Sequence, residues 1–170
     1  MLWCACAVAF FGFMRISEFT VRYKEEGQRF LTFGDIKCQD GLLSIILRSS
    51  KSSQSLPYTA VIPESTRSCC TVRAYLKYAA LCNTSPTRPV FTFADGMCLT
   101  RQRLSEFLKR SLGKSHSSHS LRMGAATTAS QCGVPIDQIR VLGRWKSDAY
   151  AVYVKPNIQQ QRSWIQLMAG

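Results

Sequence analysis

A histidine and an arginine lie three positions apart in the C-terminal half of the chain, at His119 and Arg122. On a helix, positions i and i+3 are neighbours on one face, so the imidazole and the guanidinium would point into the same space. An arginine can hold two oxygens of a phosphate with its planar fork, and a histidine can give or take a proton near neutral pH. The pair therefore suits a phosphoryl group, although an H-x-x-R spacing by itself is also typical of a surface pair or a helix cap.

A tryptophan between two basic residues, followed by two tyrosines, forms a second cluster. Trp145 lies between Arg144 and Lys146, and Tyr150 and Tyr153 follow at a spacing that places both phenols on one helix face. A phenol becomes a useful nucleophile only where a cationic pocket lowers its pKa from about 10. Taken singly, a tryptophan of this kind is more often packed in a core than functional.

Two longer runs contain these residues, SHSLRMGAA at 118–126 and GRWKSDAY at 143–150. In this order they resemble the C-terminal half of the catalytic domain of tyrosine recombinases, the phage-integrase family. The second run is most similar to the recombinases of eukaryotic crypton and DIRS-type mobile elements. The run FFGFMRISE at 10–18 resembles the family's first-arginine motif, and Lys51 lies in a polar turn where the family carries a hairpin lysine. The resemblance covers nearly the whole chain. It implies a mixed α+β, mainly α-helical catalytic core with a small antiparallel β-sheet of about three strands on one side.

The resemblance implies that two arginines hold the phosphate that is cut. Arg15 and Arg122 would clamp its oxygens and neutralise the charge that builds in the pentacoordinate transition state. Glu18 would hold Arg15 from behind. Trp145 stands where many family members have a second histidine and some a tryptophan, and its indole N–H can donate to a phosphate oxygen.

The remaining implied roles concern bond breaking. Tyr153 would attack phosphorus and form a 3′-phosphotyrosyl link, while His119 manages the tyrosine proton and Lys51 protonates the leaving 5′-oxygen. Family spacing favours Tyr153, eight residues after Trp145, over Tyr150, five residues after it. The implied function is DNA strand cleavage and religation, as in site-specific recombination or DNA integration, with no metal and no other cofactor.

The charge of the chain agrees with a polyanionic partner. It carries 22 Lys and Arg against 10 Asp and Glu, a formal net charge of +12, and most of the surplus lies within residues 101–162. Basic surfaces of this kind bind nucleic acid chiefly through its phosphates. We therefore expect double-stranded DNA as the partner. The residues expected to contact its phosphates are Arg101, Arg103, Lys109, Arg110, Lys114, Arg144 and Lys146.

The spacing of apolar residues predicts the elements that would position these side chains. Helices are expected where apolar residues recur every three or four positions, and strands where short aliphatic runs lie between turns. The expected strands cover residues 33–38, 42–47 and 56–62. The expected helices cover about residues 72–80, 104–112, 118–132, 135–143 and 158–168, with one more capped by Ser147. Residues 15–28 are expected to be loop.

Residues 1–14 and the cysteines each leave two interpretations open. The apolar run 1–14 predicts a buried core helix rather than a secretory signal, because no basic residue precedes it. The eight cysteines could form a secreted disulfide framework. Several lie in apolar runs, no C-x-x-C occurs, and neither histidine has a cysteine at zinc-ligand spacing, which favours reduced thiols in an intracellular compartment and no metal site. The expected intracellular location is the nucleus. No run approaches the roughly 20 apolar residues of a membrane-spanning helix.

The length predicts a single catalytic domain over residues 1–170, without the separate N-terminal helical domain that family members carry. A fragment, a decayed copy and a domesticated derivative of a mobile element are all compatible with this. Two other functions stay open: a DNA-binding remnant without catalysis, and supercoil relaxation in the manner of a type IB topoisomerase. Residues 158–168 could dock on a second copy or fold back on their own domain.

Overall fold

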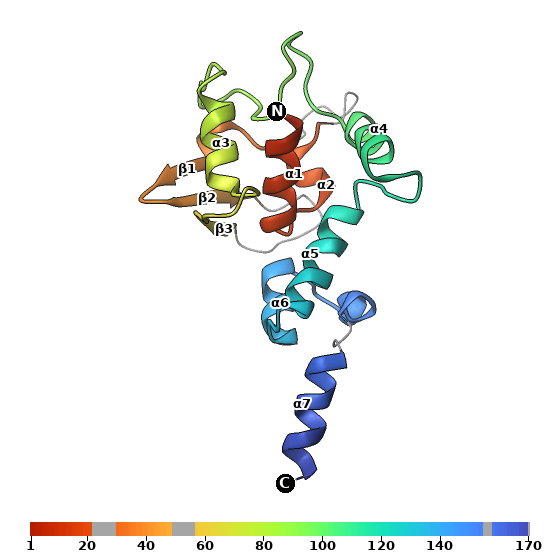
Figure 1. Cartoon of the computed structure of the whole chain (residues 1–170). Helices are drawn as coiled ribbons and strands as arrows, with labels where there is room; N and C mark the ends of the chain where they lie inside the picture. The colour runs from red at the N-terminus through yellow and green to blue at the C-terminus, as the bar shows by residue number, and fades with distance from the viewer. Residues whose placement is uncertain (22–29, 49–56, 155–157, 170) are drawn as a thin grey trace.

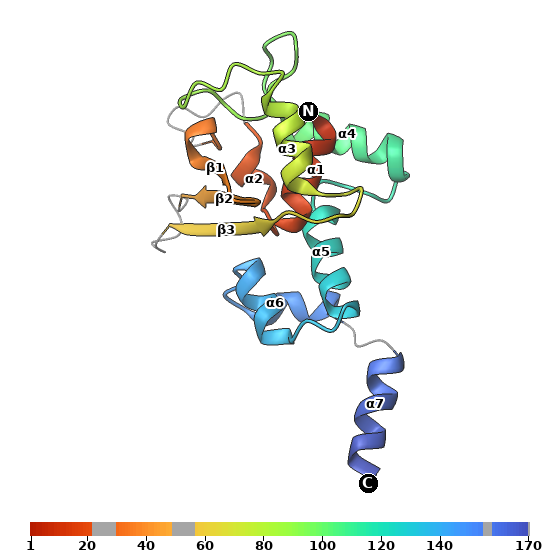
Figure 2. The same cartoon turned by 60° about the vertical axis from the view of Figure 1, so that its left-hand side comes forward.

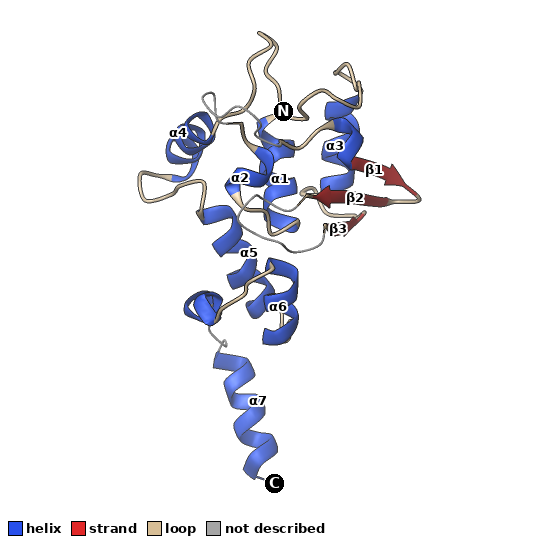
Figure 3. Cartoon of the chain, turned by 180° about the vertical axis from the view of Figure 1, so that it is seen from behind, coloured by secondary structure: helices blue, strands red, loops and turns tan. Residues whose placement is uncertain are grey.

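The structure is a computed structural model that describes residues 1–21, 30–48, 57–154 and 158–169. Helices dominate the described part, and the strands are confined to one side of the molecule (Figure 3). The mixed, mainly helical fold class with a three-stranded antiparallel sheet is therefore confirmed. In chain order the elements are α1 (Leu2–Phe11), α2 (Ile16–Phe19), η1 (Phe33–Asp35), β1 (Ile36–Gln39), β2 (Leu42–Leu47), β3 (Tyr58–Pro63), α3 (Thr71–Ala79), α4 (Arg101–Leu112), α5 (Ser120–Gln131), α6 (Ile136–Gly143), η2 (Asp148–Tyr153) and α7 (Ile158–Ala169).

The sheet has the order β1-β2-β3, with both pairs antiparallel. Asp40 and Gly41 join β1 to β2 with positive φ angles of 52° and 72°, the backbone that tight hairpins favour. Alternate residues of β2, namely Leu43, Ile45 and Leu47, are buried. They face the side of the sheet that α3 covers, so the hydrophobic alternation of the strand fixes which face meets the core (Figure 2).

Helix α1 lies in the centre of the molecule and contacts both α3 and α5 (Figure 1). Its residues Cys4, Ala5, Val8 and Ala9 are almost fully buried. Small side chains let α3 and α5 approach this helix closely. Because the helix is buried between them, its residues are apolar. The apolar N-terminal run thus forms the expected core helix, and it connects the sheet-containing half to the C-terminal helices.

The C-terminal helices form a second, smaller core. Phe13, Ala125, Ala126 and Ile139 are its buried residues, contributed by the end of α1 and by α5 and α6. Beyond this cluster, α7 extends away from the rest of the molecule and ends at the C-terminus (Figures 1 and 2). In the described part of the chain, no helix is both long enough and apolar enough to cross a membrane.

Local structure differs from the sequence expectations in three places. Residues 33–35 form a 3₁₀ turn before the first strand. The segment after Ser147 is a 3₁₀ rather than an α-helix, and the Ser147 side chain does not make the expected capping hydrogen bond. The short helix α2 lies where a loop was expected. Its first turn is closed by Glu18, whose carboxylate accepts the backbone N–H of Arg15 at 2.7 Å. A glutamate three residues after the capping position is a known helix-start signal, but Arg15 is an unusual capping residue and hides it.

Candidate functional site

Two tight backbone corners, each with a residue in the left-handed region, approach one another at the junction of the two cores. In the first, Phe13 has a φ of 49° and connects α1 to α2. In the second, Arg144 has a φ of 54° and ends α6. Residues other than glycine rarely adopt this backbone, and such strain persists only where the surrounding contacts hold it. We therefore expect specific contacts to hold both corners in this conformation.

The side chain of Arg122, from α5, connects the two corners. Its Nη1 donates to the Phe13 carbonyl at 2.9 Å, and its Nη2 donates to the Gly143 carbonyl. The next carbonyl along the second corner, that of Arg144, accepts Nη2 of Arg15 at 2.9 Å. Two successive carbonyls thus hold the two arginines that the sequence predicted to act together.

The Arg122 guanidinium is buried under an aromatic ring. The residue is 4% exposed, and its guanidinium carbon lies 4.4 Å from the centre of the Trp145 ring. Desolvation, together with the positive charges of Arg15 and Arg144, lowers the pKa of Arg122 to about 10, and the negative charge of Glu18 opposes this shift. Three guanidinium groups share one carboxylate here, so the cluster favours an anion beside it.

The second corner leaves no room for a side chain at Gly143. A Cβ built there would overlap the six-membered ring of Trp145. Trp145 also packs edge-on against Phe13. Its ring contacts that of Tyr150 in a tilted arrangement, with 5.7 Å between the ring centres. The glycine therefore lets the tryptophan ring lie flat on Arg122.

Tyr153 and His119 lie together at the end of η2 and the start of α5. Their rings meet edge to face with centres 6.4 Å apart. Tyr153 is partly exposed and His119 is exposed, whereas Tyr150 is 7% exposed and packed on Trp145. The Thr127 hydroxyl donates to the Tyr153 carbonyl at 3.0 Å. Of the two tyrosines, Tyr153 is the one whose phenol lies beside the histidine and within reach of solvent.

The predicted phosphate-contacting residues fall into separate groups. Arg101, Arg103, Lys109 and Arg110 lie on α4, which is separate from the α6–η2 corner, and Lys114 follows α4. All of these except Arg103 are exposed; Arg103 lies over the Phe93 ring and 3.9 Å from Asp95. Lys146 is exposed as well. Lys51, the expected hairpin lysine, lies outside the described residues.

Arg144 was expected to contact a DNA phosphate, but its observed partners are protein groups. Its side chain is 13% exposed, and Nη2 lies 2.8 Å from Glu18 Oε2. Sequence reasoning did not foresee this arrangement, because a helix ending at Gly143 gives no indication of where the next side chain turns.

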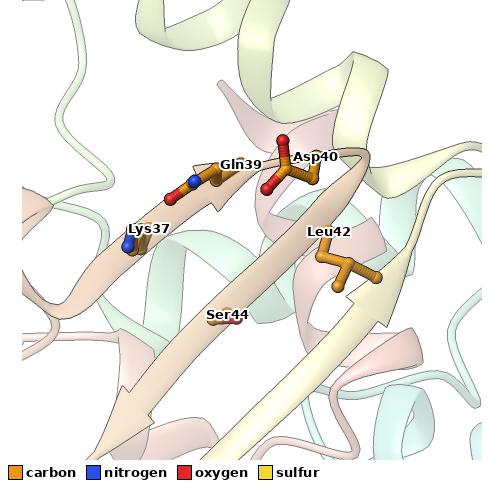
Figure 4. A pocket seen from close by; sticks show the side chains of 5 residues that line it. All are labelled: Lys37, Gln39, Asp40, Leu42 and Ser44. Atoms are coloured by element: carbon orange, nitrogen blue, oxygen red, sulfur yellow. The ribbon is translucent and has the colours of Figure 1, made fainter.

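Other features of the described residues lie apart from this cluster. A shallow hollow on the β1–β2 hairpin is lined by Lys37, Gln39, Asp40, Leu42 and Ser44 (Figure 4). Within the described ranges, no three His, Cys, Asp or Glu side chains gather closely enough to hold a metal ion. All eight cysteines lie in these ranges and are free thiols.

Comparison with known proteins gives a consistent fold. No family model matches the chain, and no curated protein matches it. Among solved structures, it is similar to XerA recombinase, with 19% identity and a TM-score of 0.69 over 98% of this chain and 56% of that one. It is also similar to XerH site-specific recombinase bound to palindromic difH substrate in a post-cleavage complex, with 14% identity, a TM-score of 0.68, and coverage of 98% and 45%.

A third similar structure is the Tn1549 transposon integrase in complex with circular intermediate DNA, with 13% identity and a TM-score of 0.57 over 95% of this chain and 56% of that one. The chain spans about half the length of the solved proteins it matches. At these identities the likeness establishes the fold, and the chain has the fold of a tyrosine recombinase catalytic domain.

Proposed function

We propose that this chain cuts and rejoins DNA strands through a covalent 3′-phosphotyrosyl intermediate on Tyr153. One observation carries the proposal: Arg15 and Arg122 are held on successive carbonyls of one corner, and the same helix that carries Arg122 begins beside the His119–Tyr153 pair. A phosphodiester in front of the arginines would meet positive charge on one side and a phenol on the other.

In the proposed reaction, the Tyr153 oxygen attacks phosphorus and the bond from phosphorus to the 5′-oxygen breaks. His119 takes the phenol proton, and Lys51 gives a proton to the leaving 5′-oxygen. Arg15 and Arg122 hold the non-bridging oxygens, with the indole N–H of Trp145 as a further donor. Because the new bond is again a phosphate ester, its energy is kept and the reverse attack by a 5′-hydroxyl reseals the strand.

Double-stranded DNA is the proposed substrate and partner. XerH and the Tn1549 integrase were both solved with DNA substrates or intermediates. In this chain, the exposed basic residues of α4 and Lys146 would bind phosphates flanking the cut site, and affinity would fall steeply with salt. A DNA substrate together with free thiols agrees with an intracellular, nuclear site of action.

Self-association through α7 is a further part of the proposal. Ile165, Leu167 and Met168 are 65%, 82% and 87% exposed on a helix that extends away from its own domain. Apolar side chains on such a helix are best buried against a second copy on paired DNA sites. Leu167→Glu should therefore weaken assembly on DNA in sedimentation experiments, whereas Gln166→Glu, the same charge at the neighbouring exposed position, should have little effect.

The test of the main proposal is covalent trapping. A pool of duplexes with random sequence around a nick is incubated with the protein, so that a cut strand loses its short 3′ neighbour and the adduct cannot reseal. We expect an adduct that survives denaturant, with the nucleotide on Tyr153 by mass spectrometry. Tyr153→Phe should abolish it, and Tyr150→Phe should retain it.

Other outcomes identify the competing functions. An undiminished adduct in Tyr153→Phe would disprove the nucleophile assignment. DNA binding without any adduct from the wild-type chain would favour a binding remnant. Relaxation of supercoiled plasmid by the wild-type chain, without strand exchange, would favour topoisomerase-like chemistry.

A further inference from the structure

Arg144 has a left-handed backbone, and both terminal nitrogens of its side chain are bonded to protein groups. Its Nε is buried without a hydrogen-bond partner among the described residues. Its φ of 54° is a conformation that glycine adopts at helix ends without strain. An arginine here needs compensating contacts. Those contacts are numerous, since Nη1 donates to the carbonyls of Gly12 at 3.3 Å and Leu142 at 3.2 Å, and Nη2 donates to the Phe13 carbonyl at 3.0 Å.

The same guanidinium pairs with the carboxylate that holds Arg15. Nη2 of Arg144 lies 2.8 Å from Glu18 Oε2, the oxygen that also accepts the Arg15 backbone N–H. The other carboxylate oxygen, Oε1, accepts Nη1 of Arg15 at 3.3 Å. The flat face of Arg144 is covered by the Tyr58 ring, whose centre is 4.9 Å away. Glu18 is thus fixed from one side by Arg144 and presents its other side to Arg15.

Arg15 is held by Arg144 in a second way, through the backbone. Its Nη2 donates to the Arg144 carbonyl at 2.9 Å, while nearly half of its side chain, 47%, is exposed. A long, half-exposed arginine has many accessible rotamers unless such contacts select one. The contacts that select it here are Glu18 and the Arg144 carbonyl.

We propose that Arg144 is a positioning residue: it fixes Glu18 and the α6 corner so that the Arg15 guanidinium stays aimed at the reacting phosphate, and it makes no phosphate contact itself. This assignment replaces the phosphate contact expected for Arg144 from charge alone, and it rests on the proposed function.

The variants can separate the two ways in which Arg144 acts. Arg144→Gly keeps the left-handed backbone and the carbonyl that accepts Arg15 but removes the side chain. Arg144→Lys keeps one charge near Glu18 but loses the fork. Lys146→Ala is the matched control, because it removes an exposed positive charge two residues further on.

The first measurement is independent of catalysis. The arginine Nε–Hε signal of Arg15, assigned with Arg15→Lys, reports the order of that side chain by NMR relaxation. We expect it to become mobile in Arg144→Gly, to be partly restored in Arg144→Lys, and to stay ordered in Lys146→Ala. If Arg144→Gly does not fold, as judged by circular dichroism, Glu18→Gln supplies the same loss of order from the other partner.

The second measurement is the salt dependence of binding to a short duplex. Removing a phosphate contact lowers the slope of log affinity against log salt by about 1. We expect that decrease for Lys146→Ala and an unchanged slope for Arg144→Gly. Adduct formation by Arg144→Gly should fall about 10- to 100-fold at unchanged DNA affinity, as for a misplaced reacting group.

An ordered Arg15 in Arg144→Gly, or a slope that falls as far as in Lys146→Ala, would overturn the assignment. Failure of the proposed function has a different signature. In that case the wild-type chain forms no adduct on any duplex, yet Arg15 still loses order in Arg144→Gly.

Discussion

The two sides of the candidate site are held in opposite ways. On the arginine side, Arg122 is buried and bonded to carbonyls from two different corners, and Arg144 makes a further set of contacts to the same corners. On the tyrosine side, Tyr153 lies in a short 3₁₀ segment, with one side-chain hydrogen bond from Thr127 to its carbonyl and an exposed histidine beside it.

The difference fits the chemistry expected of each side. Groups that stabilise developing charge work best when they are fixed in advance, because no energy is then spent in reorienting them during the reaction. A nucleophile that must approach phosphorus and later leave it benefits from looser attachment, and 3₁₀ hydrogen bonds are weaker than α-helical ones. We therefore expect changes on the arginine side to be costly and changes around Tyr153 to be mild, unless the phenol itself is removed.

The largest effect on the arginine side should come from Arg122→Lys. A lysine keeps the charge but cannot bond to the Phe13 and Gly143 carbonyls with a planar fork. We expect single-turnover adduct formation to fall about 10²- to 10³-fold, the usual cost of losing a fixed transition-state donor. DNA affinity, measured in parallel, should change little. A variant that cleaves at nearly the wild-type rate would mean that charge alone, and not its fixed geometry, matters here.

Gly143→Ala should disrupt the same side through packing. The added methyl group would require the Trp145 ring to leave its place over Arg122. We expect a loss of about 1–3 kcal/mol in urea unfolding, the range for overpacking.

Gly124→Ala is the matched control for this change. Its Cβ would lie 3.4 Å from Phe10, an ordinary contact, inside α5. Helix propensity then predicts a gain of up to about 1 kcal/mol. Equal stability changes in the two variants would show that the Trp145 contact is not tightly packed.

Thr127→Val tests how loosely the tyrosine side is held. It removes the hydroxyl that donates to the Tyr153 carbonyl. We expect a cost of about 0.5–1.5 kcal/mol in unfolding free energy and only a small change in adduct rate. Thr128→Val changes an exposed threonine next to it and should be nearly neutral in both measurements. A loss of cleavage as large as in Arg122→Lys would contradict the looser attachment of this side.

The smallest expected effect is on the pH dependence of anion binding. The folded pKa of Arg122, about 10, lies below its ordinary value of 12.5. At neutral pH its buried charge therefore opposes folding, and this cost falls progressively as the pH rises from about 10 to 12.5. Sulfate bound at the cluster offsets the cost, so sulfate should raise the melting temperature at pH 8 and do so less above pH 10. Arg122→Gln should lack this pH step, and an identical step in that variant would assign it to another group.

Much of the fold follows from local pattern. The aliphatic run of β2 and the helical stripe of α4 occur where the sequence predicted them, with Gly113 ending α4 at a φ of 107°. Each of these depends on side chains close together in sequence, so hydrophobic periodicity and turn residues are enough to find them. The helix α2 was not predicted because its local signal is weak. Glu18 is at the position of a capping-box glutamate, but the capping residue three positions before it is Arg15, which is atypical.

The residues alone indicate the types of the proposed reacting groups and their order along the chain, through Arg15, the His119–Arg122 pair and Tyr153. The inward direction of the Arg144 side chain, and the bond from its carbonyl to Arg15, 129 residues away, are visible only in the folded chain. Charge and spacing describe Arg144 and Lys146 alike, yet Arg144 is partly buried and bonded to carbonyls, whereas Lys146 is exposed. The left-handed corner at Arg144, and its packing against the Phe13 corner, set the direction of the Arg144 side chain. Such contacts join segments that are far apart in the chain, so they leave no local pattern in the sequence.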